Sequence, residues 1–296
     1  MDDIRIVEVG PRDGLQNIDQ VIDIEVKKVL IQDLRAAGLN EIEVGAFVSP
    51  KWVPQMADSR ALINSIESID GLSALVPNVK GLNYFNESKL KRVSFFMAVS
   101  ESFNNKNINM SVEESISSIS SLLEQTEGLF RRVYLSTVFF CPYEGEVSSH
   151  QLRKVFEHLS ELKFEDLSLG DTIGKATPSY VREVLKIAQD FFPVEKLSMH
   201  FHDTYGTALA NCQAALDLGI RSFDSSCSGL GGCPYAPGAS GNIATEDLVY
   251  LFEREGFRTG VDLAKLIDAS TKIDSYLERV SQSKVHQALR CNKVLD

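Results

Sequence analysis

The sequence predicts an α/β protein built as a (β/α)8 TIM barrel, with an additional helical segment at its C-terminus. Short runs of β-branched and apolar residues recur eight times along the 296-residue chain. Amphipathic stretches with helical spacing lie between most of these runs. Alternation of this kind in a chain of this length is typical of one barrel. A doubly wound sheet is the alternative, but the first run is followed by GPRDGLQN, which lacks the GxGxxG phosphate turn.

The predicted strands are the eight apolar runs. They are expected at residues 4–10, 41–47, 72–77, 92–99, 132–140, 164–171, 196–203 and 221–229. The predicted helices are the amphipathic stretches at 23–37, 56–68, 111–126, 148–161, 178–190, 206–218 and 243–255. The third gap, 78–90, is the weakest helix prediction. Thr177 before Pro178, and the segment 242–246, are typical of helix starts.

Two regions are expected from this pattern. Residues 1–256 form the barrel, and residues 257–296 form a helical extension that no Pro/Ser-rich linker separates from it. Apolar residues recur in the extension at the spacing of a buried helix face, namely Leu263, Leu266, Ile267, Ile273 and Leu277. This face is expected to pack on the barrel or against a second copy of the chain. We predict a homodimer through this segment.

Composition excludes several classes of partner. The formal net charge of −11 argues against nucleic-acid binding, although a local cationic pocket can still take an anionic substrate. The start, MDDIRIVEVG, has neither a secretory signal nor an Arg-rich transit sequence, and no apolar run approaches the roughly 20 residues of a membrane span. The five cysteines are scattered and lack CxxC spacing, which is typical of reduced thiols. We therefore expect a cytoplasmic protein without a membrane or nucleic-acid partner.

The candidate functional residues fall on the predicted strands or in the loops that follow them. A TIM barrel holds its chemistry at the C-terminal ends of its strands, so these residues are expected to meet at one mouth. They are Arg12, Asp13, Glu43, Asp171, His200, His202, Cys233 and Asn242.

A metal site is predicted from His200-Phe201-His202 at the end of the seventh strand. Alternate strand residues point to the same side, so both imidazoles can face one point. Asp13 and Asn242 are the natural further ligands, and this set suits Mg²⁺ or Mn²⁺, with Zn²⁺ less favoured. Asp203 either supports a histidine or caps the helix that follows.

Glu43 and Arg12 are predicted to pair. Glu43 interrupts a buried strand, and an unpaired buried carboxylate is costly. Arg12 is the nearest candidate partner, and it is also suited to stabilise a developing oxyanion. The alternative is that Arg12 and Asp13 form only a surface ion pair at a turn.

Cys233 differs from the cysteines that lie in or beside apolar runs, which are Cys141, Cys212 and Cys227. It lies in the glycine-rich stretch GLGGCPYAPGASGN, at 229–242. A loop of this composition can fold over a substrate, exclude water and deliver a thiol. We therefore predict a lid that carries a proton donor.

Five segments resemble the 3-hydroxy-3-methylglutaryl-CoA lyases in content and order: VEVGPRDGLQN (7–17), FVSPKWVPQMAD (47–58), SLGDTIG (168–174), MHFHDTYGTALAN (199–211) and GLGGCPYAPGASGNIATEDLVYL (229–251). The likeness covers nearly the whole chain. Single motifs such as HxH are shared with a superfamily that includes the isopropylmalate and homocitrate synthases and the carboxyltransferase domain of pyruvate carboxylase. The Cys loop together with RDGLQN points to the lyase branch.

The resemblance implies a TIM barrel that cleaves the acyl-CoA substrate 3-hydroxy-3-methylglutaryl-CoA into acetyl-CoA and acetoacetate with Mg²⁺ or Mn²⁺. It implies metal ligands at Asp13, His200, His202 and Asn242. The catalytic residues it implies are Arg12, Cys233, Glu43, Asp171 and His200, and the substrate-binding residues are Arg12 and Gln16. The chain departs from the familiar pattern at Gly45-Ala46, where many members have Ser, and at Ile18-Asp19, where Glu-Lys is familiar.

The expected chemistry is a retro-aldol (Claisen-type) cleavage. A metal lowers the pKa of the substrate's tertiary hydroxyl, and His200 or Asp13 removes its proton. Arg12 stabilises the enolate of acetyl-CoA, and Cys233 protonates the enolate carbon. One alternative is a synthase that condenses acetyl-CoA with a 2-oxo acid. Another is a catalytically silent barrel that acts as a scaffold.

Overall fold

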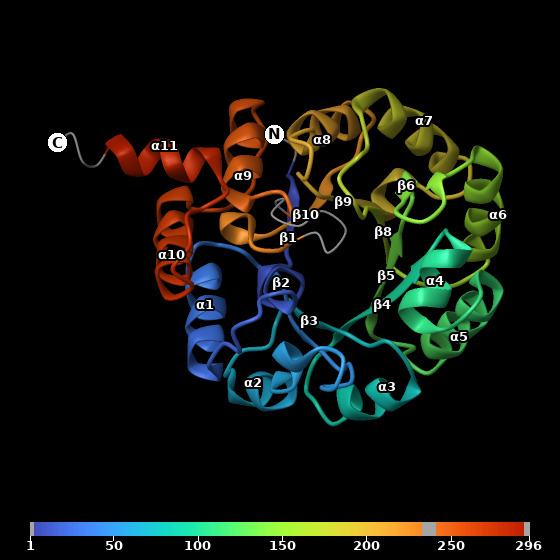
Figure 1. The fold of residues 1–296 in the computed structure, drawn as a ribbon, viewed down its shortest axis with the longest axis horizontal. Coiled ribbons are helices and arrows are strands. Elements are labelled where there is room, and N and C mark those ends of the chain that lie inside the picture. The colour runs from blue at the N-terminus through green and yellow to red at the C-terminus, as the bar shows by residue number, and fades with distance from the viewer. Residues whose placement is uncertain (1–2, 233–240, 293–296) are drawn as a thin grey trace.

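The computed structural model describes residues 3–232 and 241–292. Within these ranges, eight parallel strands close into a barrel in the order β1-β10-β9-β8-β5-β4-β3-β2, and helices surround it (Figure 1). The closing seam joins the first and last strands, which pair from Arg5 with Ser222 to Glu8 with Ser225. The predicted (β/α)8 TIM barrel is confirmed.

Each predicted apolar run overlaps one barrel strand. The strands are β1 (Arg5–Glu8), β2 (Glu41–Ala46), β3 (Leu72–Leu75), β4 (Arg92–Ala98), β5 (Phe130–Ser136), β8 (Asp166–Asp171), β9 (Leu197–Phe201) and β10 (Ser222–Ser225). The predicted fifth strand extends to residue 140, but β5 ends at Ser136 because Thr137 takes a left-handed backbone with φ of 54°. A small hairpin follows instead, made of β6 (Phe140–Cys141) and β7 (Gly145–Glu146).

The helices around the barrel are α1 (Ile24–Ala36), α2 (Ser59–Ser65), α3 (Val79–Asn86), α5 (Val112–Glu124), α6 (Ser149–Ser160), α7 (Pro178–Gln189), α8 (Ala208–Asp217) and α9 (Thr245–Arg254). The weakly predicted helix in the gap 78–90 is therefore present. The sequence did not predict α4 (Glu101–Ile108), because ESFNNKNI has too few apolar residues to show helical spacing. Among the described residues, no helix is both long and apolar enough to cross a membrane.

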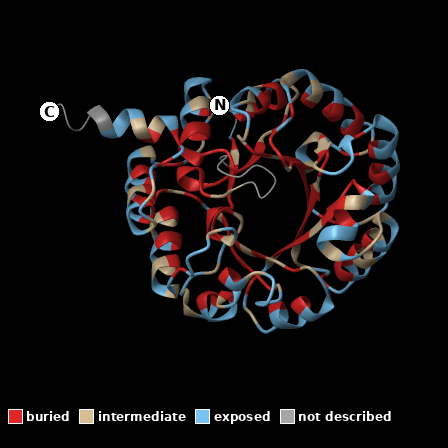
Figure 2. Cartoon of the chain, in the orientation of Figure 1, coloured by how far each residue is buried: buried red, intermediate tan, exposed pale blue. Residues whose placement is uncertain are grey.

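Buried residues lie along the strands and on the inner faces of the helices, and exposed residues lie on the outer faces (Figure 2). The N-terminal part of the barrel interior is an exception to this apolar core, because ion pairs occupy it. Arg5 and Arg92 both contact Glu41, and Arg5 and Arg132 both contact Asp166. Buried charges need partners, so this layer depends on the register of the strands that carry it.

Two further helices follow the barrel. The first, α10 (Leu263–Tyr276), packs on α1, on α9 and on the short 3-10 turn η4 (Cys227–Gly229). Leu266, Ile267 and Ile273 are buried in this contact, so the apolar face considered for a dimer packs on its own barrel. The second, α11 (Lys284–Asn292), packs on α9 and extends outward from the barrel (Figure 1).

Candidate active site and metal centre

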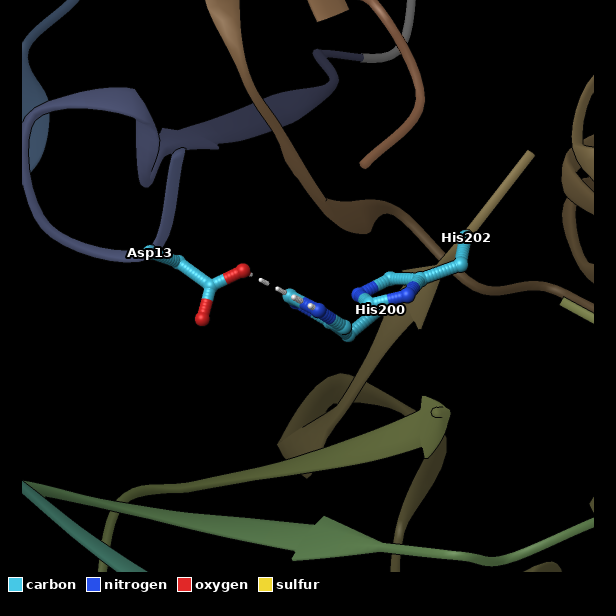
Figure 3. A group of neighbouring side chains, drawn as sticks. All are labelled: Asp13, His200 and His202. Carbon is cyan, nitrogen blue, oxygen red and sulfur yellow. Dashed lines mark ion pairs between the residues drawn. The ribbon is translucent and has the colours of Figure 1, made fainter. Parts of the chain in front are cut away.

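The residues predicted as metal ligands lie together at the C-terminal mouth of the barrel. Asp13 follows β1, and His200 and His202 lie at the end of β9 (Figure 3). Ligand atoms of these three residues lie within 4.8 Å of one another. The Asn242 amide nitrogen donates to Asp13 Oδ2 at 2.7 Å across 229 positions of sequence. The four side chains meet because the barrel closes between β1 and β10.

A single π-helical turn, η1 (Gly10–Gly14), carries Arg12 and Asp13 into the mouth. Gly14 is required here because a Cβ atom at this position would lie 2.8 Å from Leu230 Cβ. The turn therefore packs directly against the beginning of the glycine-rich loop. Any side chain larger than hydrogen at residue 14 would push the two loops apart.

Arg12 is buried between two carboxylates. Its Nε donates to Glu43 Oε1 and its Nη1 donates to Asp13 Oδ1, so the structure places the predicted Arg12–Glu43 pair in direct contact. The Tyr134 hydroxyl donates to Glu43 Oε2 at 3.3 Å, and the Tyr134 ring lies 5.3 Å from the guanidinium carbon. Burial lowers the pKa of Arg12, but the charges of Glu43 and Asp13 outweigh it and raise the pKa. The guanidinium therefore stays charged.

The electrostatics of the cluster favour the forms that bind metal. Burial raises the pKa of Asp13, but the charge of Arg12 and then of His200 outweighs it and lowers the pKa to about 2. Burial lowers the pKa of His202 to about 4, with a smaller contribution from His200. Asp13 is thus a carboxylate near neutral pH and His202 is a neutral imidazole, which are the protonation states required of metal ligands.

The geometry of the cluster also fits a divalent cation. His200 Nε2 lies 4.0 Å from Asp13 Oδ2, the pair joined by the dashed line in Figure 3. His202 Nδ1 is buried and has no hydrogen-bond partner among the described residues. A buried polar atom without a partner is costly, and a cation within the cluster would supply one. Imidazole and oxygen ligands together are typical of sites for divalent metals.

Asp171 is buried at the end of β8. Its two carboxylate oxygens accept from the backbone amides of Lys175 at 3.1 Å and Ala176 at 2.9 Å, which holds the turn between β8 and α7. Burial raises the pKa of Asp171 to about 7, and these hydrogen bonds oppose the shift. The carboxyl group therefore titrates near neutrality.

Two polar residues near the ligands have positions that the structure makes clear. Gln16 Nε2 donates to Asp13 Oδ1 at 2.9 Å, so its amide supports the predicted ligand. Asp203 accepts from the Ala208 amide at 2.9 Å, at the first residue of α8. The N-cap residue of α8 is Thr207, so Asp203 is not the predicted cap residue, although its side chain does hold the first amide of the helix.

Cys233 lies outside the described residues, so its role stays a prediction. The downstream end of the glycine-rich loop is described. The Ile243 amide donates to the Phe201 carbonyl at 3.1 Å, and the Asp203 amide donates to the Gly241 carbonyl at 2.8 Å. These bonds hold the chain against the end of β9 and place Asn242 beside His202.

Three buried residues beside the site were not predicted from the sequence: Arg132 and Tyr134 on β5, and Asp224 on β10. Arg132 donates to Asp224, which in turn contacts His200. These residues lie in runs that were assigned as apolar strands. The available signal was the polar residue at every second position, because alternate residues of a barrel strand face the interior.

Two buried glutamates support the η4 turn beside the glycine-rich loop. Glu8 Oε1 accepts from the amides of Gly10 at 2.8 Å and Cys227 at 3.0 Å, and Glu246 Oε1 accepts from the Ser228 amide at 2.9 Å. Burial raises the pKa of Glu8 to about 7 and the pKa of Glu246 to about 8. Both groups therefore change charge in the neutral range.

Comparison with known proteins agrees with this geometry. The HMGL-like family matches residues 3–273. A Pseudomonas aeruginosa protein, 3-hydroxy-3-isohexenylglutaryl-CoA/hydroxy-methylglutaryl-CoA lyase, is 47% identical over 97% of this chain and 97% of its own length. The solved HMG-CoA lyase of Bacillus subtilis superposes with a TM-score of 0.95, at 44% identity over 98% of this chain and 99% of its own. An HMG-CoA lyase from Acinetobacter baumannii, solved with coenzyme A and 3-methylmalate, superposes with a TM-score of 0.91 at 35% identity over 97% of this chain and 95% of its own. The family match over most of the chain and the high identity of full-length relatives show that this chain belongs to the HMGL-like family.

Proposed function

We propose that this protein is a carbon–carbon lyase that cleaves 3-hydroxy-3-methylglutaryl-CoA into acetyl-CoA and acetoacetate with a divalent cation, Mg²⁺ or Mn²⁺. The observation that carries the proposal is the meeting of Asp13, His200 and His202 with the Arg12–Glu43 pair at one barrel mouth. The relatives' names supply the substrate, and the relative solved with coenzyme A supports an acyl-CoA ligand.

Four residues would hold the cation: Asp13, His200, His202 and Asn242. When bound, it would act as a Lewis acid on the substrate's oxygen atoms and lower the pKa of the tertiary hydroxyl. Asp13 is suited to this site because it is already ionised, and His202 because its imidazole is neutral. Gln16 donates to Asp13 Oδ1, and we propose that its amide also contacts the substrate.

Side chains of the protein remove the proton, stabilise the enolate and return a proton to it. Of the two bases predicted, Asp13 and His200, we propose that Asp13 takes the proton of the tertiary hydroxyl, because a neutral imidazole has one lone pair and His200 would use it to hold the cation. The hydroxyl oxygen then forms the ketone of acetoacetate as the C–C bond breaks. The electron pair of that bond passes to the acetyl-CoA fragment, which leaves as an enolate. Arg12 stabilises the enolate oxygen, while Glu43 fixes the position of Arg12. We propose Cys233 as the acid that protonates the enolate carbon.

Asp171 completes the proposed set of catalytic carboxyl groups. Its carboxyl oxygens hold the turn after β8, and its chain neighbour Gly170 is the register partner of His200 on β9. A carboxyl group that titrates near neutrality is suited to exchange protons during turnover.

The proposal is tested by measuring acetoacetate release from 3-hydroxy-3-methylglutaryl-CoA before and after removal of metal with EDTA. We expect activity that EDTA abolishes and that Mg²⁺ or Mn²⁺ restores. His202→Ala should lower Mn²⁺ affinity by at least about tenfold, because an inner ligand is lost. His158→Ala, at an exposed position on α6, is the matched control and should bind Mn²⁺ normally. Absence of cleavage, or cleavage that EDTA leaves unchanged, would contradict the proposal.

We also propose a cytoplasmic homodimer. Cys141, Cys212 and Cys227 are free thiols, which supports a reducing compartment. After α10 has packed on the barrel, three apolar side chains of the C-terminal segment stay exposed, those of Tyr276, Val280 and Leu289. A second copy of the chain that packs on this segment would bury them.

A further inference from the structure

A carboxylate that the proposed chemistry does not use lies directly beneath the site. Asp224, on β10, is the register partner of His200 on β9, and its side chain points into the barrel interior. It is 2% exposed. Asp224 Oδ2 lies 3.1 Å from His200 Nδ1, on the side of the imidazole away from Asp13.

Each oxygen of Asp224 has a defined partner. Oδ1 accepts from Arg132 Nη2, and Oδ2 accepts from Ser168 Oγ at 2.8 Å as well as facing His200 Nδ1. Asp224 forms an ion pair with the guanidinium of Arg132, which is always charged, so Asp224 is a carboxylate, and a carboxylate only accepts hydrogen bonds.

The ionised carboxylate of Asp224 determines which nitrogen of the His200 imidazole carries a hydrogen. Because Asp224 Oδ2 has no proton to give, His200 Nδ1 must carry the hydrogen of this contact. In a neutral imidazole the other nitrogen, Nε2, then holds the lone pair. Nε2 is the atom that faces Asp13 Oδ2 at 4.0 Å.

We propose that Asp224 is a positioning residue that fixes His200 in the tautomer and ring orientation that direct the Nε2 lone pair at the Asp13 cluster. This role rests on the proposed function, in which Nε2 binds the cation. Arg132 contributes to this positioning, because it neutralises the buried carboxylate of Asp224 and fixes which of its oxygens faces His200. Paired supports of this kind orient histidine ligands and raise their affinity for metal.

Asp224→Asn tests the proposal with no change of shape. Arg132 needs an acceptor, so the amide oxygen of Asn takes the Oδ1 position and the amide NH₂ faces His200 Nδ1. That NH₂ donates to Nδ1 and moves the imidazole hydrogen to Nε2. The lone pair then no longer faces Asp13, and Mn²⁺ affinity should fall by about 10- to 100-fold.

Asp166→Asn is the matched control. Asp166 contacts the same Arg132 and lies in the same buried charge layer, but its partners are Arg5 and Ser198 instead of His200. The Asp166→Asn substitution removes one buried negative charge beside Arg132, as Asp224→Asn does. We expect it to lower thermal stability while Mn²⁺ affinity stays within about threefold of the parent protein.

The readouts are ¹⁵N NMR of the histidine side chains in the metal-free protein and Mn²⁺ titration by electron paramagnetic resonance. His200 is assigned from the signals that disappear in His200→Gln. At a pH at which the imidazole of His200 is neutral, the parent protein should show protonated Nδ1 and unprotonated Nε2, and Asp224→Asn should show the reverse. The spectrum of the parent protein decides the tautomer even if Asp224→Asn fails to fold.

Three results would overturn the positioning role. They are a hydrogen on Nε2 of the neutral His200 imidazole in the parent protein, unchanged Mn²⁺ affinity in folded Asp224→Asn, and an equal loss of affinity in Asp166→Asn. A failure of the proposed function can be distinguished from these three results. In that case the parent protein would bind no Mn²⁺, while the NMR spectrum would still show whether Asp224 fixes the tautomer of His200. A loss of affinity in Asp224→Asn alone, with the reversed tautomer, supports the assignment.

Discussion

Arg12 contacts Glu43 with Nε and Asp13 with Nη1, so one planar side chain binds two carboxylates in different directions. Lysine keeps the charge but lacks this planar fork. We expect Arg12→Lys to remain folded and to bind Mn²⁺ within about threefold of the parent protein, while kcat falls by about 10²- to 10³-fold. Steady-state kinetics at saturating Mn²⁺ check this. Arg182→Lys, on the outer surface, is the control, and near-normal kcat in Arg12→Lys would assign enolate stabilisation to another group.

The proposed metal ligands of this site could be predicted from the sequence, but the residues that hold those ligands in place could not. Asp13, His200 and Asn242 carry a signal of their own, because polar residues at strand ends are expected at a barrel mouth. Asp224 and Arg132 lie within strands, and their meeting depends on the closed barrel bringing β5 and β10 to the same interior. Nothing in either strand alone specifies that contact.

At the scale of elements, the η4 turn depends on Glu246, whose pKa is raised from 4.5 to about 8, and on Glu8, raised to about 7. A carboxyl group with a raised folded-state pKa gives stability that is complete below about pH 4.5 and is lost as pH rises toward 8. Each group contributes a slope of about 1.4 kcal/mol per pH unit within its window. The free energy of unfolding should therefore fall as pH rises through the neutral range.

Glu246→Gln should flatten this pH dependence, because the amide stays neutral. The measurement is urea unfolding from about pH 5 to about pH 9, compared with the parent protein and with Glu255→Gln, an exposed glutamate at the end of the same helix. The Glu255 control should keep the slope of the parent protein. Equal slopes in all three proteins would mean that Glu246 does not titrate inside the fold in this range.

Element prediction succeeded where periodicity was strong and failed where backbone geometry decided. The pattern located all eight barrel strands and the helices between them, including the weak case at 78–90. It extended the fifth strand past Ser136, because the apolar residues continue although Thr137 turns the chain. It missed α4, whose ends are set by the Ser100 cap and the left-handed Asn109.

At the scale of the whole molecule, the proposed dimer is open to a direct test. Sedimentation at micromolar concentration should give the mass of two chains. Replacing Val280 and Leu289 by Glu should give one chain, because charge would enter the contact. The control is Val79→Glu, at an exposed position on α3, and this variant should remain a dimer. A parent protein that sediments as one chain would contradict the proposal.

The seam between β1 and β10 also determines when the cation site can form during synthesis, because the chain is made from its N-terminus. Asp13 leaves the ribosome 229 residues before its partner Asn242. The strand that seals the barrel, β10, and both histidines at the end of β9 also emerge long after Asp13. A nascent chain therefore has no complete cation site until Asn242 has emerged, so metal binding does not guide the folding of the segments that are made before it.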